Sequence, residues 1–366
     1  MNFKPSIKVD NMDRKTILLL GVSVLILVIM LWFVGIDQVI SALKMANIGI
    51  IALAIATQVF TYFLYTLRWQ ILNRLADMDV SIKKLLPMVL VGLAVNNITP
   101  SGRGGGEPVR AYLLSQSNDE YHFEDSLATV VADRALDTFP FVLLAAITIA
   151  SMALFFDFDI WLIVVMVLAV IAIVAVLIIL IYMCINPNFG NRVDGWIIGL
   201  VRRFYKKNSE EFENQIHEAI FGFQETMKLL ISNKKGLVYT LTLSFIIWIF
   251  EIVRVYFVFL AFGANVNLIV IGEVFIVACL VGMIPLLPGG LGAIDGLMIL
   301  FYSAAGIPSS VSAAATVIER LISFWMTTII GLVLMPYYGS SVLDKISSGS
   351  SQDEQDEGAE KDIEDN

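Results

Sequence analysis

The sequence predicts an all-α, polytopic membrane protein with about eight transmembrane helices and two re-entrant hairpins in an inverted repeat. Three observations support this prediction. The 366 residues are 58% hydrophobic with a mean hydropathy of +0.80, which is typical of an integral membrane protein. A polar, glycine-rich pattern occurs twice between apolar runs. The basic connections between the apolar runs indicate the orientation of the spans.

Eight apolar segments are candidate spans, since a helix needs about 20 residues to cross a bilayer. We expect them at residues 17–35, 48–67, 85–98, 126–156, 160–184, 237–262, 268–287 and 311–337. The third and seventh are short, and we expect a return helix after each, at 104–116 and 293–305. The first segment is too long for a signal-peptide core and has no small-residue cleavage site, so we expect it to remain as a membrane anchor.

Soluble segments flank and divide the membrane region. The expected divisions are a cytoplasmic N-terminal segment (1–15), the first repeat (16–185), a cytoplasmic basic insert (186–235), the second repeat (236–338) and a disordered acidic tail (339–366). Residues 351–366 hold eight acids and one Lys, a composition that cannot bury enough apolar surface to order itself. In the insert, apolar residues recur at three- and four-residue steps and predict an amphipathic helix on the membrane surface: Phe212, Ile216, Ile220, Phe223, Met227 and Leu230.

The two glycine-rich stretches have the same order of residues. Pro100-Ser-Gly-Arg-Gly-Gly-Gly-Glu107 matches Pro288-Gly-Gly-Leu-Gly-Ala-Ile-Asp295, with an acid seven residues after each proline. Further matches are Asp133-Arg134 with Glu319-Arg320, and Arg68 with Arg254. All of these lie at a shift of about 186 to 188 residues, which indicates an internal duplication.

Broken backbone at membrane depth is tolerated only where it is buried in protein or lines a wet cavity. Glycine pairs also allow close helix packing without a ligand. Pro and Gly at corresponding positions of two repeats are nevertheless the best sequence indication of a transport site. We therefore expect hinges and close backbone approach at Asn97, Thr99, Pro100, Gly102, Gly104, Gly105, Gly106, Pro288, Gly289, Gly290, Gly292 and Asp295.

Loop charge predicts the topology. Lys and Arg are concentrated in the N-terminal segment, in the 68–84 connection and in the insert, so these segments and both termini are expected in the cytoplasm of a multi-pass cell-membrane protein. The second span ends at Arg68-Trp69, where a cation and an aromatic ring suit the membrane interface. Counting crossings from the N-terminus, the two copies run in opposite directions. Inverted repeats whose broken helices meet near the midplane are typical of alternating-access transporters.

Ionisable residues are unusually frequent inside the apolar regions. Eleven occur there: Glu107, Arg110, Asp133, Arg134, Asp137, Glu251, Arg254, Glu273, Asp295, Glu319 and Arg320. Each costs roughly 2.5–3.5 kcal/mol at a helix centre, so we expect partners or a wet cavity. Asp133 and Asp137 share a helical face, where like charges repel unless a cation lies between them. That cation could be Arg134 or an arginine of the other repeat.

Two interpretations of these charges stay open. In one, the charges are paired and hold helices together. In the other, they bind an anionic group such as a phosphate, which Arg grips with two hydrogen bonds, and the positive N-terminal ends of the return helices point at it. The candidate residues of this cationic cavity are Arg103, Arg110, Arg134, Arg254 and Arg320. Acids that position these arginines or bind coupled protons are Glu107, Asp133, Glu251 and Glu319. Asp137 is a further candidate for substrate binding.

No metal, cofactor or covalent catalysis is expected. His122 and His217 have no clustered partners. Cys184 and Cys279 both lie in apolar runs, so no disulfide framework is implied. Neither a GxxxxGK[ST] phosphate loop nor a GxSxG nucleophile elbow occurs.

Several of these motifs occur together in one known family. The run Asn97-x-Thr-Pro100 with Gly-Gly-x-Glu-Pro-x-Arg110, together with Asp133-Arg134, Pro288-Gly-Gly-Leu-Gly and Glu319-Arg320, resembles the lysylphosphatidylglycerol synthase transmembrane-region family. The resemblance covers roughly residues 15–338. This is the flippase-like domain of the bacterial multiple peptide resistance factor and of many archaeal proteins.

The resemblance implies movement of a lipid with a charged or glycosylated head group between leaflets. The bacterial factor also has a soluble aminoacyl transferase domain, and the short acidic tail here cannot be one, so synthesis of aminoacyl lipid is not implied. Arg103 stands where the second repeat has Leu291, so head-group contact is expected on the first copy.

The sequence thus predicts a flippase-like transporter, not an enzyme, that moves a polar or anionic lipid, including glycosylated or aminoacylated ones. The expected partners are membrane lipids and a second copy of the chain in a homo-oligomer, with no nucleic acid. One alternative is an ion-coupled carrier of a small anion, which needs no lateral opening to lipid. Another is an intramembrane polyprenyl-phosphate transferase in which Asp133 and Asp137 act with a divalent metal. A scaffold role fits poorly with so many costly charges.

Overall fold

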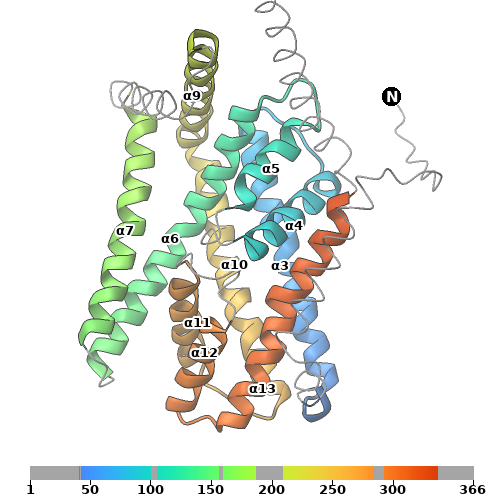
Figure 1. Cartoon of the computed structure of the whole chain (residues 1–366), viewed down its shortest axis with the longest axis vertical. Helices are drawn as coiled ribbons and strands as arrows, with labels where there is room; N and C mark the ends of the chain where they lie inside the picture. The colour runs from blue at the N-terminus through green and yellow to red at the C-terminus, as the bar shows by residue number, and fades with distance from the viewer. Residues whose placement is uncertain are drawn as a thin grey trace, which may run out of the picture.

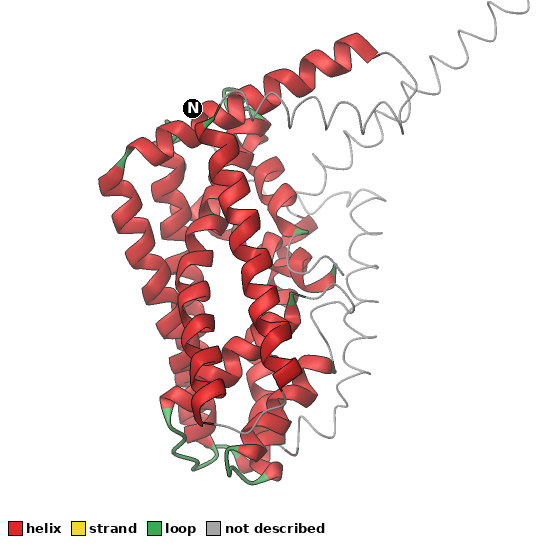
Figure 2. Cartoon of the chain, turned by 90° about the vertical axis from the view of Figure 1, so that its left-hand side faces the viewer, coloured by secondary structure: helices red, strands yellow, loops and turns green. Residues whose placement is uncertain are grey.

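The computed structural model describes residues 41, 43–99, 105–155, 160–186, 209–283 and 292–336. The first predicted span, both proline–glycine breaks (100–104 and 284–291) and the acidic tail lie outside these residues. Every regular element in the described ranges is a helix, and Figure 2 shows no strand among them, which confirms the all-α prediction. Four of the described helical stretches are long and apolar enough to cross a membrane: Ile48–Leu75, Phe123–Leu154, Lys234–Ala261 and Ser309–Pro336.

Within the described residues, four helices belong to the first copy and two further helices connect it to the second copy (Figure 1). The helices of the first copy are α3 (Ile48–Leu75), α4 (Ile82–Ile98), α5 (Gly106–Ser115) and α6 (Phe123–Phe155). The connecting helices are α7 (Ile160–Ile185) and α9 (Ser209–Ser232). The helices of the second copy are α10 (Lys234–Ala261), α11 (Leu268–Gly282), α12 (Ala293–Ala304) and α13 (Ser309–Arg320), and α13 continues through a π-helical stretch, Leu321–Met326.

The duplication seen in the sequence extends to the helix boundaries. The helices α3, α4, α5 and α6 begin at 48, 82, 106 and 123, and α10, α11, α12 and α13 begin at 234, 268, 293 and 309, so the shifts are 186, 186, 187 and 186 residues. The caps follow the same shift. Asn47 accepts hydrogen bonds from the N–H groups of Gly49 and Ile50 at the start of α3, and Asn233 accepts one from Gly236 at the start of α10. Asparagine is a preferred N-cap because its side-chain oxygen satisfies N–H groups that have no partner within the helix.

The two copies pack with opposite directions. The N–H of Asn47, at the start of α3, donates to the carbonyl of Ala261, at the end of α10, over 2.8 Å. At the other end, a side chain on Gly236 would meet the side chain of Leu75 at 2.4 Å, so the start of α10 lies against the end of α3. These contacts make α3 and α10 antiparallel along their lengths, as Figure 1 shows. In the same view, the α4–α5 pair lies in the upper half of the bundle and the α11–α12 pair in the lower half.

Glycine decides how closely α4 and α5 approach. A Cβ on Gly106 would lie 2.0 Å from the carbonyl oxygen of Gly92, which belongs to the facing backbone. A Cβ on Gly92 would lie 2.5 Å from the side chain of Arg110. The buried Asn96 side chain accepts a hydrogen bond of 2.7 Å from the N–H of Gly106, so α4 also holds the start of α5. The predicted close backbone approach at Gly106 is therefore an approach to another helix.

Of the two connecting helices, α9 packs against the bundle and α7 exposes most of its apolar side chains. On α9, Met227 and Leu230 are buried in a cluster with α3 and α6, and Phe223 packs beside them. Half of the predicted apolar face of the insert thus contacts the bundle, and the placement of the rest on a membrane surface stays a prediction. On α7, by contrast, most large apolar side chains are exposed, as a lipid-facing helix requires.

Candidate functional site

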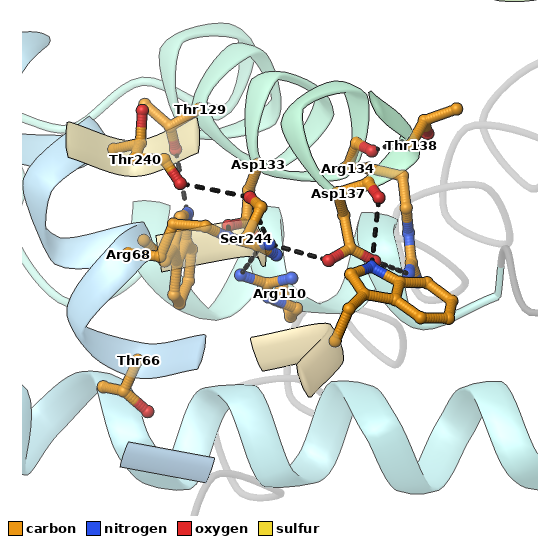
Figure 3. Close-up of polar contacts among 12 residues, drawn as sticks. Thr66, Arg68, Arg110, Thr129, Asp133, Arg134, Asp137, Thr138, Thr240 and Ser244 are labelled. Carbon is orange, nitrogen blue, oxygen red and sulfur yellow. Dashed lines mark hydrogen bonds and ion pairs between the residues drawn. The ribbon is translucent and has the colours of Figure 1, made fainter. Parts of the chain in front are cut away.

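Arg68 is the centre of the first of two buried charge clusters (Figure 3). Its Nε donates to Asp133 and one terminal nitrogen donates to Asp137, both over 2.7 Å, and the side chain is only 2% exposed. The same terminal nitrogen donates to the hydroxyl of Ser244 on α10 over 2.9 Å. The interpretation of Arg68 as an interfacial residue is therefore wrong, because α3 continues past it and the bundle encloses it.

The cation between Asp133 and Asp137 is thus Arg68 of the same repeat, rather than Arg134 alone or an arginine of the other repeat. Two more arginines complete this cluster. Arg110 donates to the second oxygen of Asp133 over 3.0 Å and lies over the ring of Trp69, 4.2 Å from its centroid. Arg134 donates twice to Glu107, once through Nε over 2.9 Å, and lies 4.0 Å from Asp137.

The first cluster therefore holds three arginines and three carboxylates in mutual contact: Arg68, Arg110, Arg134, Glu107, Asp133 and Asp137. Buried charges need partners of this kind. Burial removes the hydration free energy of a charged side chain, and attraction to a distant charge is too weak to compensate for this loss. For Arg68 and Asp133, the interpretation of paired charges that hold helices together describes the geometry well.

Arg254 is the centre of the second cluster. It is 1% exposed and donates to Glu251, to Glu319 over 2.9 Å, and to the side-chain oxygen of Gln58 on α3. Next to it, Nε of Arg320 lies 2.8 Å from Asp295, whose other oxygen accepts from the N–H of Gly292 at the start of α12. The return-helix acids Glu107 and Asp295 thus both pair with the arginine that follows the buried acid of the next helix.

The two clusters are related by the internal duplication. Arg68 corresponds to Arg254 (68 + 186 = 254), and Ser244 corresponds to Gln58 (58 + 186 = 244). Arg68 of the first copy binds Ser244 of the second, while Arg254 of the second binds Gln58 of the first. Such reciprocity is the signature of a two-fold axis, where residue i meets j and j meets i.

A second set of contacts obeys the same rule. Tyr62 and Thr327 share a hydrogen bond between the copies, and the residues that correspond to them at the shift of 186, Trp248 and Phe141, pack with ring centroids 5.4 Å apart. The two copies are therefore joined by equivalent contacts made twice, with different chemistry each time.

A cavity of about 170 Å³ lies between the copies at this axis. Its charged lining residues are Arg134, Arg254, Arg320, Asp137, Glu251 and Glu319. Its other polar and aromatic lining residues are Gln58, Tyr62, Tyr65, Asn96, Asn97, Trp248, Phe275, Ser323, Phe324 and Thr327. The described lining has three arginines and three carboxylates, so its formal charges balance, whereas the sequence led us to expect an excess of cations.

The structure separates the predicted site residues into groups. Arg110, Glu107 and Asp133 lie behind the lining, in the first cluster. Among the predicted hinge positions, Asn97 lines the cavity, whereas Thr99, Gly105, Gly106, Gly292 and Asp295 do not. Outside the described residues are Pro100, Gly102, Arg103, Gly104, Pro288, Gly289 and Gly290.

Sequence reasoning missed Arg68 as a member of the charge cluster, and its match to Arg254 in the repeat was the available signal. It also missed Gln58, Tyr62 and Trp248, which are uncharged and carry no comparable signal. The π-helical stretch Leu321–Met326 begins directly after Arg320, and Ser323 and Phe324 within it line the cavity. Single π-helical turns occur frequently at functional sites, because they re-aim side chains within a helix.

Membrane-length helices, buried ion pairs between them and a polar cavity between two copies define a polytopic α-helical membrane protein. Comparison of the sequence with protein families agrees with this class. The chain belongs to the family described as lysylphosphatidylglycerol synthase TM region, which matches residues 17–331.

Similar proteins cover most of the chain. A UPF0104 membrane protein of Methanothermobacter thermautotrophicus is 48% identical over 335 residues, which are 92% of this chain and 99% of that protein. A UPF0104 membrane protein of Methanocaldococcus jannaschii is 31% identical and covers 88% of this chain and 94% of its own length. The phosphatidylglycerol lysyltransferase of Staphylococcus aureus is 27% identical over 112 residues, which are 31% of this chain and 13% of that enzyme.

Proposed function

We propose that this protein is a lipid transporter of the flippase type, which moves a polar or anionic lipid between membrane leaflets. The observation that supports this most directly is the cavity at the axis between two oppositely directed copies, lined by ion pairs from both. Substrate sites of inverted-repeat transporters lie at the repeat interface, where one copy can rock against the other around a fixed site. A chain that only anchored itself in the membrane would gain nothing from buried charges that cost free energy to insert.

The membrane arrangement that we propose has about eight spans, cytoplasmic termini and two re-entrant hairpins, α4–α5 and α11–α12. At 1.5 Å per residue, the 17 residues of α4 reach about 26 Å and the 10 of α5 about 15 Å. The 15 residues of α11 and the 12 of α12 reach about 22 Å and 18 Å. All four fall short of the ~30 Å hydrocarbon core. Their packing in pairs and the antiparallel α3 and α10 support entry from opposite faces.

Cysteine accessibility tests this topology. Asp119, in the loop after the first hairpin, and Ser310, in the first turn of α13 after the second hairpin, are both exposed, and they should lie on opposite sides of the membrane. We expect a membrane-impermeant thiol reagent added to intact cells to label Ser310→Cys and not Asp119→Cys, in a background without the native cysteines. Inside-out vesicles should reverse the result. Labelling of both positions from the same side would exclude the inverted arrangement.

Arg134 is the side chain that we propose to contact the lipid head group. It lines the cavity and its side chain is 42% exposed, whereas Arg254 is 1% exposed. A phosphate could replace a carboxylate on its guanidinium with two parallel hydrogen bonds. The aromatic and amide groups of the lining would contact the rest of the head group, as in other largely apolar pockets with a few convergent polar groups.

We propose transport rather than transferase chemistry for the buried acids. Asp133 and Asp137 are both held by Arg68, and Asp133 is held by Arg110 as well, so both carboxylates are engaged by arginines. Within the described residues, no group of three or more His, Cys, Asp or Glu side chains could hold a metal ion. The relationship to a phosphatidylglycerol lysyltransferase supports a lipid substrate in general rather than a particular one.

Leaflet exchange in liposomes tests the function. Purified protein should accelerate exchange of a fluorescent anionic or sugar-linked lipid. Arg134→Ala should reduce this rate at least tenfold, because Arg134 is the one arginine of the described lining whose side chain is substantially exposed. Arg74→Ala, which removes an exposed arginine from α3, is the matched control and should leave the rate unchanged. If no lipid exchanges while a small phosphate-bearing anion is taken up, the protein is a solute carrier instead.

A further inference from the structure

The second charge cluster has two carboxylates for one guanidinium. Arg254 is the shared partner of Glu251 and Glu319, and it also donates to the uncharged side chain of Gln58. This trio has a formal charge of −1 when both acids are ionised. The first cluster, by contrast, pairs three arginines with three carboxylates. The surplus carboxylate of the second cluster lines the cavity.

The surplus arises where the two copies differ. Glu251 stands at the position of Tyr65 in the first copy (65 + 186 = 251). Arg110, which supplies the second cation to Asp133, corresponds to Met298 at the shift that aligns Glu107 with Asp295 (110 + 188 = 298). The second copy has thus gained an acid and lost a cation around otherwise equivalent Arg–acid pairs. A net negative charge remains at 12% side-chain exposure for Glu251 and 5% for Glu319, where solvent screens it little.

Other ionisable groups also face the cavity, and the charged ones have partners outside the Arg254 trio. Tyr62 and Tyr65 face it from α3, and Cys279 faces it from α11. From α6, Arg134 and Asp137 face it with their partners of the first cluster.

From α13, Arg320 faces the cavity and pairs with Asp295. The lining residues of α4 and α12 are uncharged, and α9 packs on α10 near its first turns, around Leu237 and Leu241. These arrangements leave Arg254 as the cation that contacts both Glu251 and Glu319.

We propose that the Glu251–Glu319 pair binds one proton from the cavity and that this proton is the coupling ion of transport, a role that rests on the proposed lipid-transport function. One proton neutralises the trio and removes the uncompensated buried charge. Buried carboxylates that exchange protons are a recurrent device of membrane transporters. Protonation also removes a negative charge from the cavity lining, so an anionic head group bound at Arg134 meets less like-charge repulsion. Binding of the proton would then raise the affinity for the anionic lipid, and binding of the lipid would raise the affinity for the proton.

Infrared spectroscopy on purified protein in lipid nanodiscs tests the proton site without any transport. The carbonyl stretch of protonated carboxyl groups is recorded as a difference between alkaline and acidic buffer. We expect Glu251→Gln to remove one carboxyl group per chain from this signal. Glu319→Gln should do the same, because either change leaves one carboxylate with Arg254. If Glu251→Gln does not fold, Glu319→Gln alone tests whether the pair binds a proton.

Glu273→Gln is the matched control. Glu273 lies on α11, lines a separate apolar pocket and does not line the central cavity. This variant should keep the signal that the two cavity variants lose. If the signal persists in both cavity variants, or is lost only in Glu273→Gln, the proposed proton site is wrong.

Lipid exchange under an imposed pH gradient tests the coupling. The wild-type protein should drive net lipid movement in the direction of proton flow, and Glu251→Gln should exchange lipid at a rate that no longer responds to the gradient. If the wild-type exchange rate does not depend on the pH gradient, the proposed coupling role is wrong. If the infrared signal depends on Glu251 but no lipid moves, the proton site stands and the proposed lipid substrate fails.

Discussion

Replacing Arg68 by alanine is expected to destabilise the folded protein by about 3–5 kcal/mol, the usual cost of removing one partner of a buried ion pair. The change leaves Asp133 and Asp137 facing each other on one turn of α6 without the cation between them. It also removes the hydrogen bond to Ser244, which joins the two copies. Arg110 still neutralises part of Asp133, so most of the loss should come from Asp137 and from like-charge repulsion.

Unfolding of detergent-solubilised protein with increasing denaturant measures this effect. The matched control is Arg74→Ala on the same helix, whose ion pair with Asp79 is 58% and 82% exposed on its two sides. Exposed pairs contribute about 0–1 kcal/mol, so the control should change the unfolding midpoint little. Arg68→Lys should lie between the two, because lysine keeps the charge but cannot reach both aspartates with a planar fork. Equal midpoints for Arg68→Ala and Arg74→Ala would mean that the buried cluster does not stabilise the fold.

Gly106→Ala is expected to destabilise the protein by about 3 kcal/mol, at the upper end of the usual cost of overpacking. The added Cβ would lie 2.0 Å from the Gly92 carbonyl oxygen, which is backbone and cannot rotate away. The helices α4 and α5 would have to separate, which would stretch the hydrogen bond from Gly106 to Asn96 and move Arg110 away from Asp133. The loss should therefore extend from the hairpin to the first charge cluster.

The second copy supplies the control for this prediction. Gly296 lies on the return helix α12, and a Cβ there meets no atom within 4 Å. Gly296→Ala should be neutral or should stabilise by up to about 1 kcal/mol through helix propensity. Thermal unfolding of both variants in the same detergent makes the comparison. A Gly106→Ala protein as stable as the wild type would show that the two backbones are farther apart than the structure has them.

The sequence by itself determined the class of protein, its family and its duplication. Apolar length, mean hydropathy and the positions of Pro and Gly are properties of short segments, so they can be read without knowing which segments meet. The shift of about 186 residues is likewise a property of the chain, and the helix starts and the asparagine caps follow it. The same local information placed the ionisable residues on their helices and showed that they need partners.

Only the tertiary structure decided which partner each charge has. Asp133 and Asp137 are bridged by a side chain 65 and 69 residues away, and Arg68 and Arg254 reach across to the opposite copy. Such contacts depend on helix rotation and on the antiparallel packing of α3 with α10, neither of which is encoded in any one segment. For the same reason, the balance of charge in the cavity could not be counted from the arginines in the sequence. It depends on which carboxylates the packing brings to them, because a guanidinium out of water requires a partner within a few ångströms.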